Sequence, residues 1–202
     1  MIEEIILATS NKQKVEEMKK ILNDLEIKVI AMTSFCKYPE TDEDGKTLEE
    51  NAIKKAKDAA KFFNKWTLAD DSGLEVDWLN GEPGVYSARY AGEDRLYDNN
   101  NKKLLLALKG VPFEKRTAKF RTVIVISSPN GEIYLAEGKN YGIITLQSLG
   151  NNGFGYDPVF YVPEYKKTFA ELSINIKNSI SHRAIALQKA KEIIKSLSQA
   201  GE

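Results

Sequence analysis

Two adjacent acids, Asp70 and Asp71, follow an apolar stretch and precede Ser72-Gly73. Neighbouring carboxylates repel each other and are costly to desolvate unless a cation lies close by. A second acidic segment lies upstream and contains Glu40, Asp42, Glu43 and Asp44. Carboxylate oxygens suit Mg²⁺, which usually keeps waters and phosphate oxygens as well. An Asp-rich turn would explain either segment alone, but the two together predict a divalent-metal site.

A polar turn near the N-terminus, ATSNKQK at residues 8–14, is a candidate anion site. It lies between a predicted strand and a predicted helix, where unpaired N–H groups and the positive end of the helix dipole favour an anion. The candidate ligands are Thr9, Ser10, Asn11, Lys12, Gln13 and Lys14. A helix cap is the commoner use of such residues, and the GxxxxGK[ST] spacing of a P-loop is absent. With the two acidic segments, this turn would complete a metal–triphosphate site.

Two C-terminal segments carry groups that suit a nucleobase. The first is GFGYDP at residues 153–158, where glycines allow close backbone approach, aromatic rings offer a stacking face and Asp157 can accept from a ring N–H. A tight turn with core aromatics is the alternative. The second is His182-Arg183, whose donors match a purine O6 acceptor, with Lys177 upstream in reach of phosphate or base. A lone histidine is more often structural.

Hydrophobic periodicity places these segments on an alternation of strands and helices. A capping-box pattern, Thr47 followed by Glu50, opens one of the helices. Strands are expected at Ile5–Ala8, Ile27–Ala31, Trp66–Ala69, Leu74–Trp78, Thr117–Ser127, Ile133–Glu137 and Val159–Val162, with Asp70–Gly73 as a break. Helices are expected from Val15 to Leu25, from Leu48 to Phe63, over Asp98–Leu108 and from Arg183 to about Ser198.

This pattern predicts an α/β fold with a twisted mixed β-sheet flanked by helices. We expect residues 1–202 to form a single domain of two lobes with a central active-site cleft. Lys plus Arg and Asp plus Glu number 29 each, so no overall field favours nucleic acid. The sequence shows neither a signal peptide nor a membrane span. Its one cysteine, Cys36, is expected to be a small buried hydrophobe, and the chain to be cytoplasmic.

With these segments identified, the sequence resembles the inosine-triphosphate (xanthosine-triphosphate) pyrophosphatases, which remove deaminated purine nucleotides. The matching runs keep the family's order over residues 7–187. They are LATSNKQKVEE, EDGKTLEENAIKKAK, LADDSGLEVDWLNGEPGVYSARYAG, GFGYDPVFYVP, KTFAEL and KNSISHRAIAL. The resemblance implies a long mixed sheet, a homodimer, Mg²⁺ dependence and cleavage between the α- and β-phosphates of ITP, dITP and XTP.

The resemblance also implies roles for single residues. Asp71 matches a metal ligand that also accepts a proton, Asp70 lies beside it, and Glu43 is preferred over Glu40 and Asp42 as the second metal acid. Lys14 and Lys55 match phosphate-neutralising lysines, and Ser72 a substrate contact. The turn matches the phosphate site through Thr9, Ser10, Asn11 and Lys14, and the base-binding loop matches Phe154, Gly155, Tyr156 and Asp157. The remaining base and phosphate contacts match Lys177, His182 and Arg183.

A mechanism follows from these roles as an expectation. Water attacks the α-phosphorus while Asp71 or its neighbour takes the proton. His182 and Arg183 satisfy a 6-oxo group, whereas the amino group of adenine would face donors. Two other classes stay open: a nucleotide sensor that does not cleave its ligand, and a nucleic-acid-binding module. Among enzymes, a related pyrophosphatase for pyrimidine or modified nucleotides is the alternative.

Overall fold

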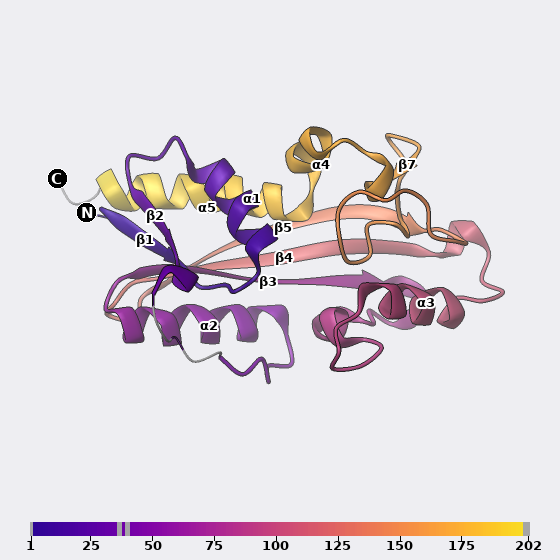
Figure 1. Ribbon diagram of the computed structural model, residues 1–202, viewed down its shortest axis with the longest axis horizontal. Coiled ribbons are helices and arrows are strands. Elements are labelled where there is room, and N and C mark those ends of the chain that lie inside the picture. Colours follow the sequence, from indigo (N-terminus) through magenta and orange to yellow (C-terminus); the bar gives the residue numbers. More distant parts are fainter. Residues whose placement is uncertain (1, 36–37, 39–40, 200–202) are drawn as a thin grey trace. The chain divides into compact units, whose positions relative to one another are not determined.

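The computed structural model describes residues 2–35, 38 and 41–199, so Cys36 and Glu40 lie outside the described residues. Its α-helices are α1 (Lys12–Leu22), α2 (Leu48–Phe63), α3 (Tyr97–Ala107), α4 (Ile174–Ile180) and α5 (His182–Gln199). Its strands are β1 (Glu4–Leu7), β2 (Lys28–Ala31), β3 (Trp66–Val76), β4 (Thr117–Ser127), β5 (Ile133–Ile144), β6 (Phe160–Val162) and β7 (Lys167–Thr168) (Figure 1).

The described strands form a seven-stranded sheet with the order β2-β1-β3-β4-β5-β6-β7. Strand β1 pairs parallel to β2 and β3, whereas β6 pairs antiparallel to β5 and β7. The predicted α/β fold with a mixed sheet is therefore confirmed. No helix in the described part of the chain has the length and apolar character needed to cross a bilayer.

The chain divides into two compact units. Unit 1 takes its residues from 1–71, 122–138 and 183–202, and unit 2 from 72–121 and 139–182. Strands β3, β4 and β5 each contribute residues to both units. The expected cleft between two lobes stays a prediction, as does the single-domain assignment.

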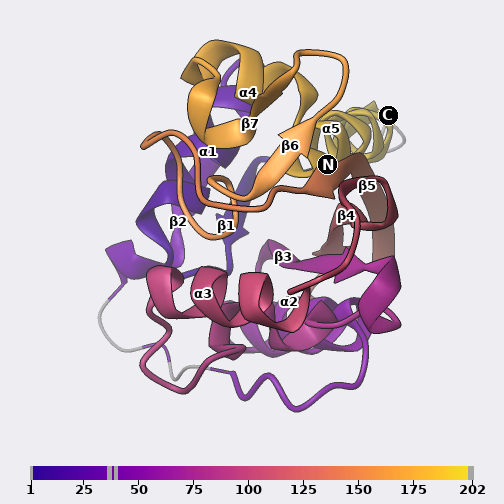
Figure 2. The same cartoon turned by 90° about the vertical axis from the view of Figure 1, so that its right-hand side faces the viewer.

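Unit 1 has helices on both faces of its strands. In both views α1 and α5 lie on one face and α2 on the other (Figures 1 and 2). The α1–α5 face is a buried apolar core, as the helical periodicity requires. Its members include Ile5, Leu7, Met18, Leu22, Leu68, Ile124, Leu187 and Ile194. On the other face α2 buries a stripe of small residues, and the Thr67 hydroxyl donates to the Ala56 carbonyl at 2.7 Å.

Strand β3 is continuous, so the predicted break at Asp70–Gly73 is wrong. Four polar or small residues in a row suggested a turn, yet the strand runs from Trp66 to Val76. Successive side chains of a strand point to opposite faces, so Asp70 and Asp71 do not confront one another. Each carboxylate contacts a different cation, Lys14 for Asp70 and Lys55 for Asp71. Both acids can therefore be buried within a continuous strand, and no turn is needed to expose them to solvent.

Several smaller differences have local causes. Helix α1 ends at Leu22 instead of Leu25, because the chain turns there and Leu25 N donates to the Leu22 carbonyl at 3.1 Å. Leu25 still packs against the unit 1 core, which explains the longer apolar pattern. Strand β5 extends to Ile144, beyond the predicted Glu137. The short elements β7 and α4 were not predicted at all.

Unit 2 has a core rich in aromatic residues. Its buried members include Leu74, Val76, Leu104, Leu108, Phe120, Phe160 and Phe169. Strand β3 passes close to the segment 84–89. The approach is so close that a Cβ at Gly73 would lie 2.4 Å from the Gly84 carbonyl oxygen. The Ser87 hydroxyl joins the two, accepting from Leu74 N at 2.8 Å and donating to the Gly84 carbonyl at 2.6 Å. Gly73 is therefore required for this contact.

Candidate active site

The turn after β1 caps a helix with its own side chains. The Asn11 side chain accepts from Gln13 N at 3.0 Å and from Lys14 N at 3.2 Å, and Asn11 N donates to the Thr9 hydroxyl at 3.3 Å. The expectation that these N–H groups are unpaired is therefore wrong for these three residues, since the capping alternative describes them. Ser10, Lys12 and Gln13 are exposed, so the turn still presents polar side chains at the start of α1.

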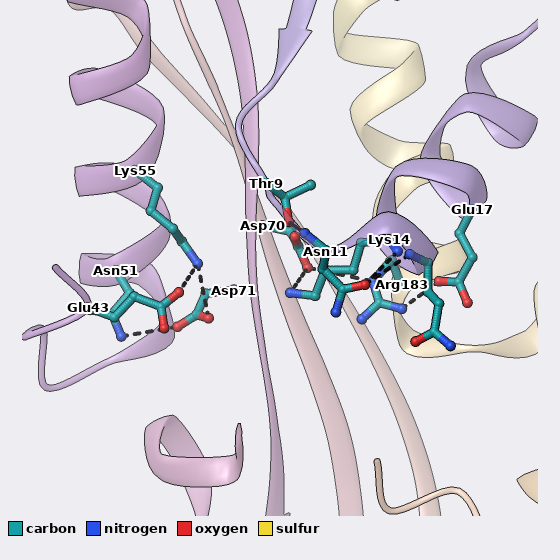
Figure 3. A network of polar contacts seen from close by, with 11 residues as sticks. Thr9, Asn11, Lys14, Glu17, Glu43, Asn51, Lys55, Asp70, Asp71 and Arg183 are labelled. Carbon is teal, nitrogen blue, oxygen red and sulfur yellow. Dashed lines mark hydrogen bonds and ion pairs between the residues drawn. The ribbon is translucent and has the colours of Figure 1, made fainter. Parts of the chain in front are cut away.

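Asp70 points from β3 towards α1 and α5, where two cations meet it (Figure 3). Its Oδ2 lies 2.8 Å from Lys14 Nζ and 3.6 Å from Arg183 Nε, and its side chain has no exposed surface. Burial alone would raise the pKa of Asp70, but Lys14 and Arg183 hold that pKa far below its ordinary value. Arg183 also contacts Glu17, with 2.5 Å between Nη1 and Oε2. Asp70 is therefore a fixed negative charge.

Asp71 points the other way, towards α2, into a different set of partners (Figure 3). Its Oδ1 lies 3.3 Å from Lys55 Nζ, and its Oδ2 accepts from Asn51 Nδ2 at 3.1 Å. Burial is the largest influence on the pKa of Asp71 and raises it, and Glu43 adds to the rise. The charges of Lys55 and Lys14 and the hydrogen bond from Asn51 oppose the rise only in part. The pKa values of the two adjacent acids are thus shifted in opposite directions. Such a pattern is typical of sites in which two carboxyl groups have different chemical roles.

One residue of the acidic segment, Glu43, contacts the group around Asp71. Glu43 Oε1 lies 2.7 Å from Lys55 Nζ, so one ammonium group contacts both Glu43 and Asp71. Asp42 is exposed, and Asp44 pairs with Lys54 at 2.7 Å with most of its side chain in solvent. Of the three described acids of the segment, Glu43 is the one that contacts a partner of Asp71, and its role as a metal ligand stays a prediction.

The sequence reasoning missed Asn51, which joins the acidic segment to Asp71. Its Oδ1 accepts from Gly45 N at 2.8 Å while its Nδ2 donates to Asp71. A Cβ at Gly45 would lie 2.6 Å from that oxygen, so the approach needs glycine. Asn51 precedes Lys55 by one helical turn and occupies a buried position on an otherwise apolar face, but this spacing alone does not distinguish a functional asparagine from a structural one.

The donor set around Asp71 fits a small divalent cation. Two carboxylates from separate segments already meet a single positive charge, the ammonium of Lys55. Among residues 2–35, 38 and 41–199 no group of three or more His, Cys, Asp or Glu side chains is arranged to hold a metal. Mg²⁺ is commonly held by one or two carboxylates together with substrate phosphates instead of an all-protein cage. Glu43 and Asp71 supply that number of ligands.

In unit 2 the loop 153–157, called the base loop below after its predicted role, is held by a buried ion pair. Asp157 Oδ2 lies 2.7 Å from Lys177 Nζ, and both side chains are almost fully buried. The same oxygen accepts from Phe154 N at 2.8 Å, and Lys177 Nζ lies 4.7 Å from the centroid of the Phe154 ring. A Cβ at Gly153 would lie 2.0 Å from the Asp157 carboxylate, so this fold of the loop needs glycine there.

The remaining predicted residues fall into both units. Tyr156 is buried, with its hydroxyl donating to the Ser87 carbonyl at 2.9 Å, and burial raises the pKa of that hydroxyl. The His182 ring stacks on Phe120, with centroids 4.6 Å apart and an interplanar angle of 10°. Ser72 is half-buried on β3. Arg183 was predicted, with His182, as a base and phosphate contact. In the structure it contacts the carboxylates of Asp70 and Glu17.

The mixed sheet carries two carboxylates whose pKa values are shifted in opposite directions, and each carboxylate contacts a different lysine. The fold is therefore that of an α/β protein, and the site contains the groups used in phosphate chemistry. The model of the Ham1 family matches residues 5–193. A relative from Desulforamulus reducens named dITP/XTP pyrophosphatase is 55% identical over 96% of this chain and 96% of its own length. One of the same name from Clostridium perfringens is 48% identical over 97% of this chain and 99% of its own.

Two solved structures are similar over nearly the whole chain. A HAM1 protein from Coxiella burnetii has a TM-score of 0.90 at 43% identity, with 97% of this chain and 100% of that chain covered. The Ham1 protein of Staphylococcus aureus has a TM-score of 0.87 at 44% identity, with 96% and 98% covered. This chain belongs to the Ham1 family, and the resemblance found in its sequence is confirmed.

Proposed function

We propose that this protein hydrolyses non-standard purine nucleoside triphosphates, ITP, dITP and XTP, to the monophosphate and pyrophosphate. In doing so it clears deaminated purines from the nucleotide pool. One observation carries the proposal: Asp71, whose pKa is raised, meets Glu43 at a single cation, while its neighbour Asp70 is held ionised. The relatives named dITP/XTP pyrophosphatase support the choice of substrate.

Mg²⁺ is the cofactor that the donor set favours, with Glu43 and Asp71 as its protein ligands. When bound, this ion neutralises phosphate charge and lowers the pKa of a water molecule. Lys55 now contacts both carboxylates, and it would exchange them for phosphate oxygens once another cation balances their charge. We assign Asp71 to take a proton from the attacking water, because Asp70 is held ionised between Lys14 and Arg183 and its lowered pKa makes it the weaker base.

The other cation of the centre, Lys14, has a fixed partner in Asp70. We assign Lys14 to the phosphates together with Lys55 and the polar turn of Thr9, Ser10, Asn11, Lys12 and Gln13. Because Asn11 already caps α1, the turn contributes mainly through side chains and through the positive end of the helix dipole. Asp70 keeps Lys14 in place and does not act as a base.

The base is assigned to the loop residues Phe154, Gly155, Tyr156 and Asp157. Lys177, His182 and Arg183 are assigned to the base and the phosphates, and Ser72 is assigned to the substrate. Donors at the six-position satisfy hypoxanthine or xanthine and leave the amino group of adenine opposed to another donor. Arg183 is engaged by Glu17 and Asp70, but a guanidinium group has five N–H donors, so these contacts do not exclude an acceptor on the base. We further propose a homodimer that acts in the cytoplasm, where the nucleotide pool is.

Pyrophosphate release from a panel of nucleotides tests the function. The purified protein should release pyrophosphate from ITP, dITP and XTP in the presence of Mg²⁺, and a chelator should abolish the release. ATP, dATP and a pyrimidine triphosphate serve as controls and should give little product. Equal turnover of ATP and ITP would refute the selectivity, preference for the pyrimidine would favour the related class, and binding without any product would favour a sensor.

A further inference from the structure

Helix α3 carries three consecutive asparagines with different environments. Asn99 is exposed, whereas Asn100 and Asn101 are buried with 2% and 4% of their surface accessible. Asparagine is a poor residue for a helix interior, because its side chain competes for backbone hydrogen bonds. Two buried asparagines in one helical turn therefore need a reason other than helix formation.

Asn101 holds the base loop from α3. Its Nδ2 donates to the Gly155 carbonyl at 3.0 Å, and its Oδ1 has no hydrogen-bond partner within the described part of the chain. Gly155 adopts a positive φ of 66° and has no side chain that could anchor it. Its carbonyl is the group through which α3 holds this point of the loop.

Asn100 secures a second point of the same loop indirectly. Its Oδ1 accepts from Ala91 N at 2.6 Å, and its Nδ2 donates to the Ala88 carbonyl at 3.0 Å. These contacts hold the segment that presents the Ser87 carbonyl, which accepts from the Tyr156 hydroxyl at 2.9 Å. Consecutive residues of α3 thus restrain consecutive residues of the base loop.

We propose that Asn101 is a positioning residue for recognition of the base, an inference that rests on the proposed function. The base loop places Phe154 and Asp157 on either side of the restrained pair, and Phe154 also lies 6.0 Å from Tyr97 of α3, between ring centroids. Without the Asn101 amide the Gly155 carbonyl loses its hydrogen bond to α3, and glycine permits several backbone conformations at this point of the loop. Phe154 and Asp157 stay joined by their own hydrogen bond, but the loop that carries them is no longer held against α3 and opens more readily, so the discrimination between bases falls.

The test replaces Asn101 by Leu and by Ala, with Asn99→Leu and Asn99→Ala as matched controls on the exposed side of the same helix. Leu keeps the volume, and Ala favours the helix, so two different ways of losing the amide are compared. For each variant we would measure the melting temperature, and kcat and KM for dITP and for dATP. Amide hydrogen exchange at Phe154 and Asp157 gives a readout that does not depend on activity.

The expected result is a fall of about tenfold or more in the dITP/dATP ratio of kcat/KM, since small displacements in a site have large kinetic effects. The fall should come mainly from a higher KM for dITP. Exchange at the Phe154 and Asp157 amides should become faster in both Asn101 variants and stay unchanged in the Asn99 variants.

Two results would overturn the inference. One is an unchanged selectivity ratio in folded Asn101 variants; the other is an equal loss for both nucleotides, which marks a merely structural role. If the wild-type protein does not prefer dITP, the proposed function fails, and the exchange data alone decide whether Asn101 restrains the loop.

Discussion

Asp70 and Asp71 are neighbours in the chain, yet the two faces of β3 give them different chemistry. On the α1–α5 face, Asp70 is fully buried between Lys14 and Arg183, and its pKa is far below the ordinary value. On the α2 face, burial dominates for Asp71 and its pKa is raised. Both side chains are buried, so burial does not explain the difference. The number and closeness of the cations around Asp70, together with the like charge of Glu43 near Asp71, explain it.

This comparison shows how one strand can supply two functions from adjacent positions. The alternation of side chains along β3 sends consecutive residues to opposite helices. A charge that must stay fixed and a group that must gain and lose a proton can therefore be encoded side by side. A loop at the same positions would not separate the two environments so completely.

The largest effect is expected from Asp71→Asn, which removes the base and one metal ligand but keeps the shape of the side chain. Loss of a positioned base typically costs on the order of 10²–10⁴-fold in rate. Pyrophosphate release from dITP under saturating Mg²⁺ measures the loss. Binding of dITP should survive in part, and a variant with near-normal kcat would remove Asp71 from the mechanism.

Asp70→Asn tests the other face and should act on stability. The substitution leaves Lys14 and Arg183 beside a neutral, buried amide, and removal of one partner from a buried ion pair costs about 3–5 kcal/mol. Urea unfolding at neutral pH gives the change in free energy. Asp71→Asn is the matched control: its carboxylate is disfavoured by burial, so its removal should cost clearly less. Equal losses in the two variants would erase the contrast.

The two acids should also titrate apart. In the metal-free protein the Asp71 carboxyl should protonate above the ordinary pKa of aspartate and the Asp70 carboxyl below it, as followed by carbon NMR of the side chains. Because the folded-state pKa of Asp70 is lowered, its contribution to stability is present above the unfolded-state pKa and is lost as the pH falls through the folded-state pKa. Asp71 has the opposite sign, and its ionisation opposes folding.

Asn51→Leu sharpens the same measurement. The hydrogen bond from Asn51 favours ionised Asp71, so its loss should raise the pKa of Asp71 further. The pKa of Asp70 should not change, because Asn51 lies on the α2 face. An equal shift of both pKa values would mean that Asn51 does not act on Asp71 alone.

The helices and the functional candidates could be predicted from the sequence, but the contacts between them could not. Periodicity identified α2 and its Thr47 cap, and both acids were selected as functional candidates. The prediction of a turn at Asp70–Gly73 failed, because local composition cannot reveal that Lys14, Lys55 and Arg183 from three separate helices neutralise the strand. Asn51 and Asn101 were missed for the same reason. A buried asparagine has no spacing signature, and its partners are known only once the chain has folded.

The smallest effect is expected at the ion pair next to the centre. Lys54 and Lys55 are consecutive in α2 and each contacts an acid of the segment 41–46, but Asp44 and Lys54 lie in solvent, whereas Lys55 is largely buried. Lys54→Met should leave both turnover of dITP and stability unchanged within error, because exposed ion pairs contribute little. Lys55→Met should lower turnover strongly, since this ammonium lies between two carboxylates and is assigned to the phosphates. Steady-state kinetics at two salt concentrations would compare the turnover of dITP by the two variants. A strong loss of turnover in Lys54→Met would show that the whole acidic segment contributes to catalysis, and that Glu43 does not differ from the other acids of the segment.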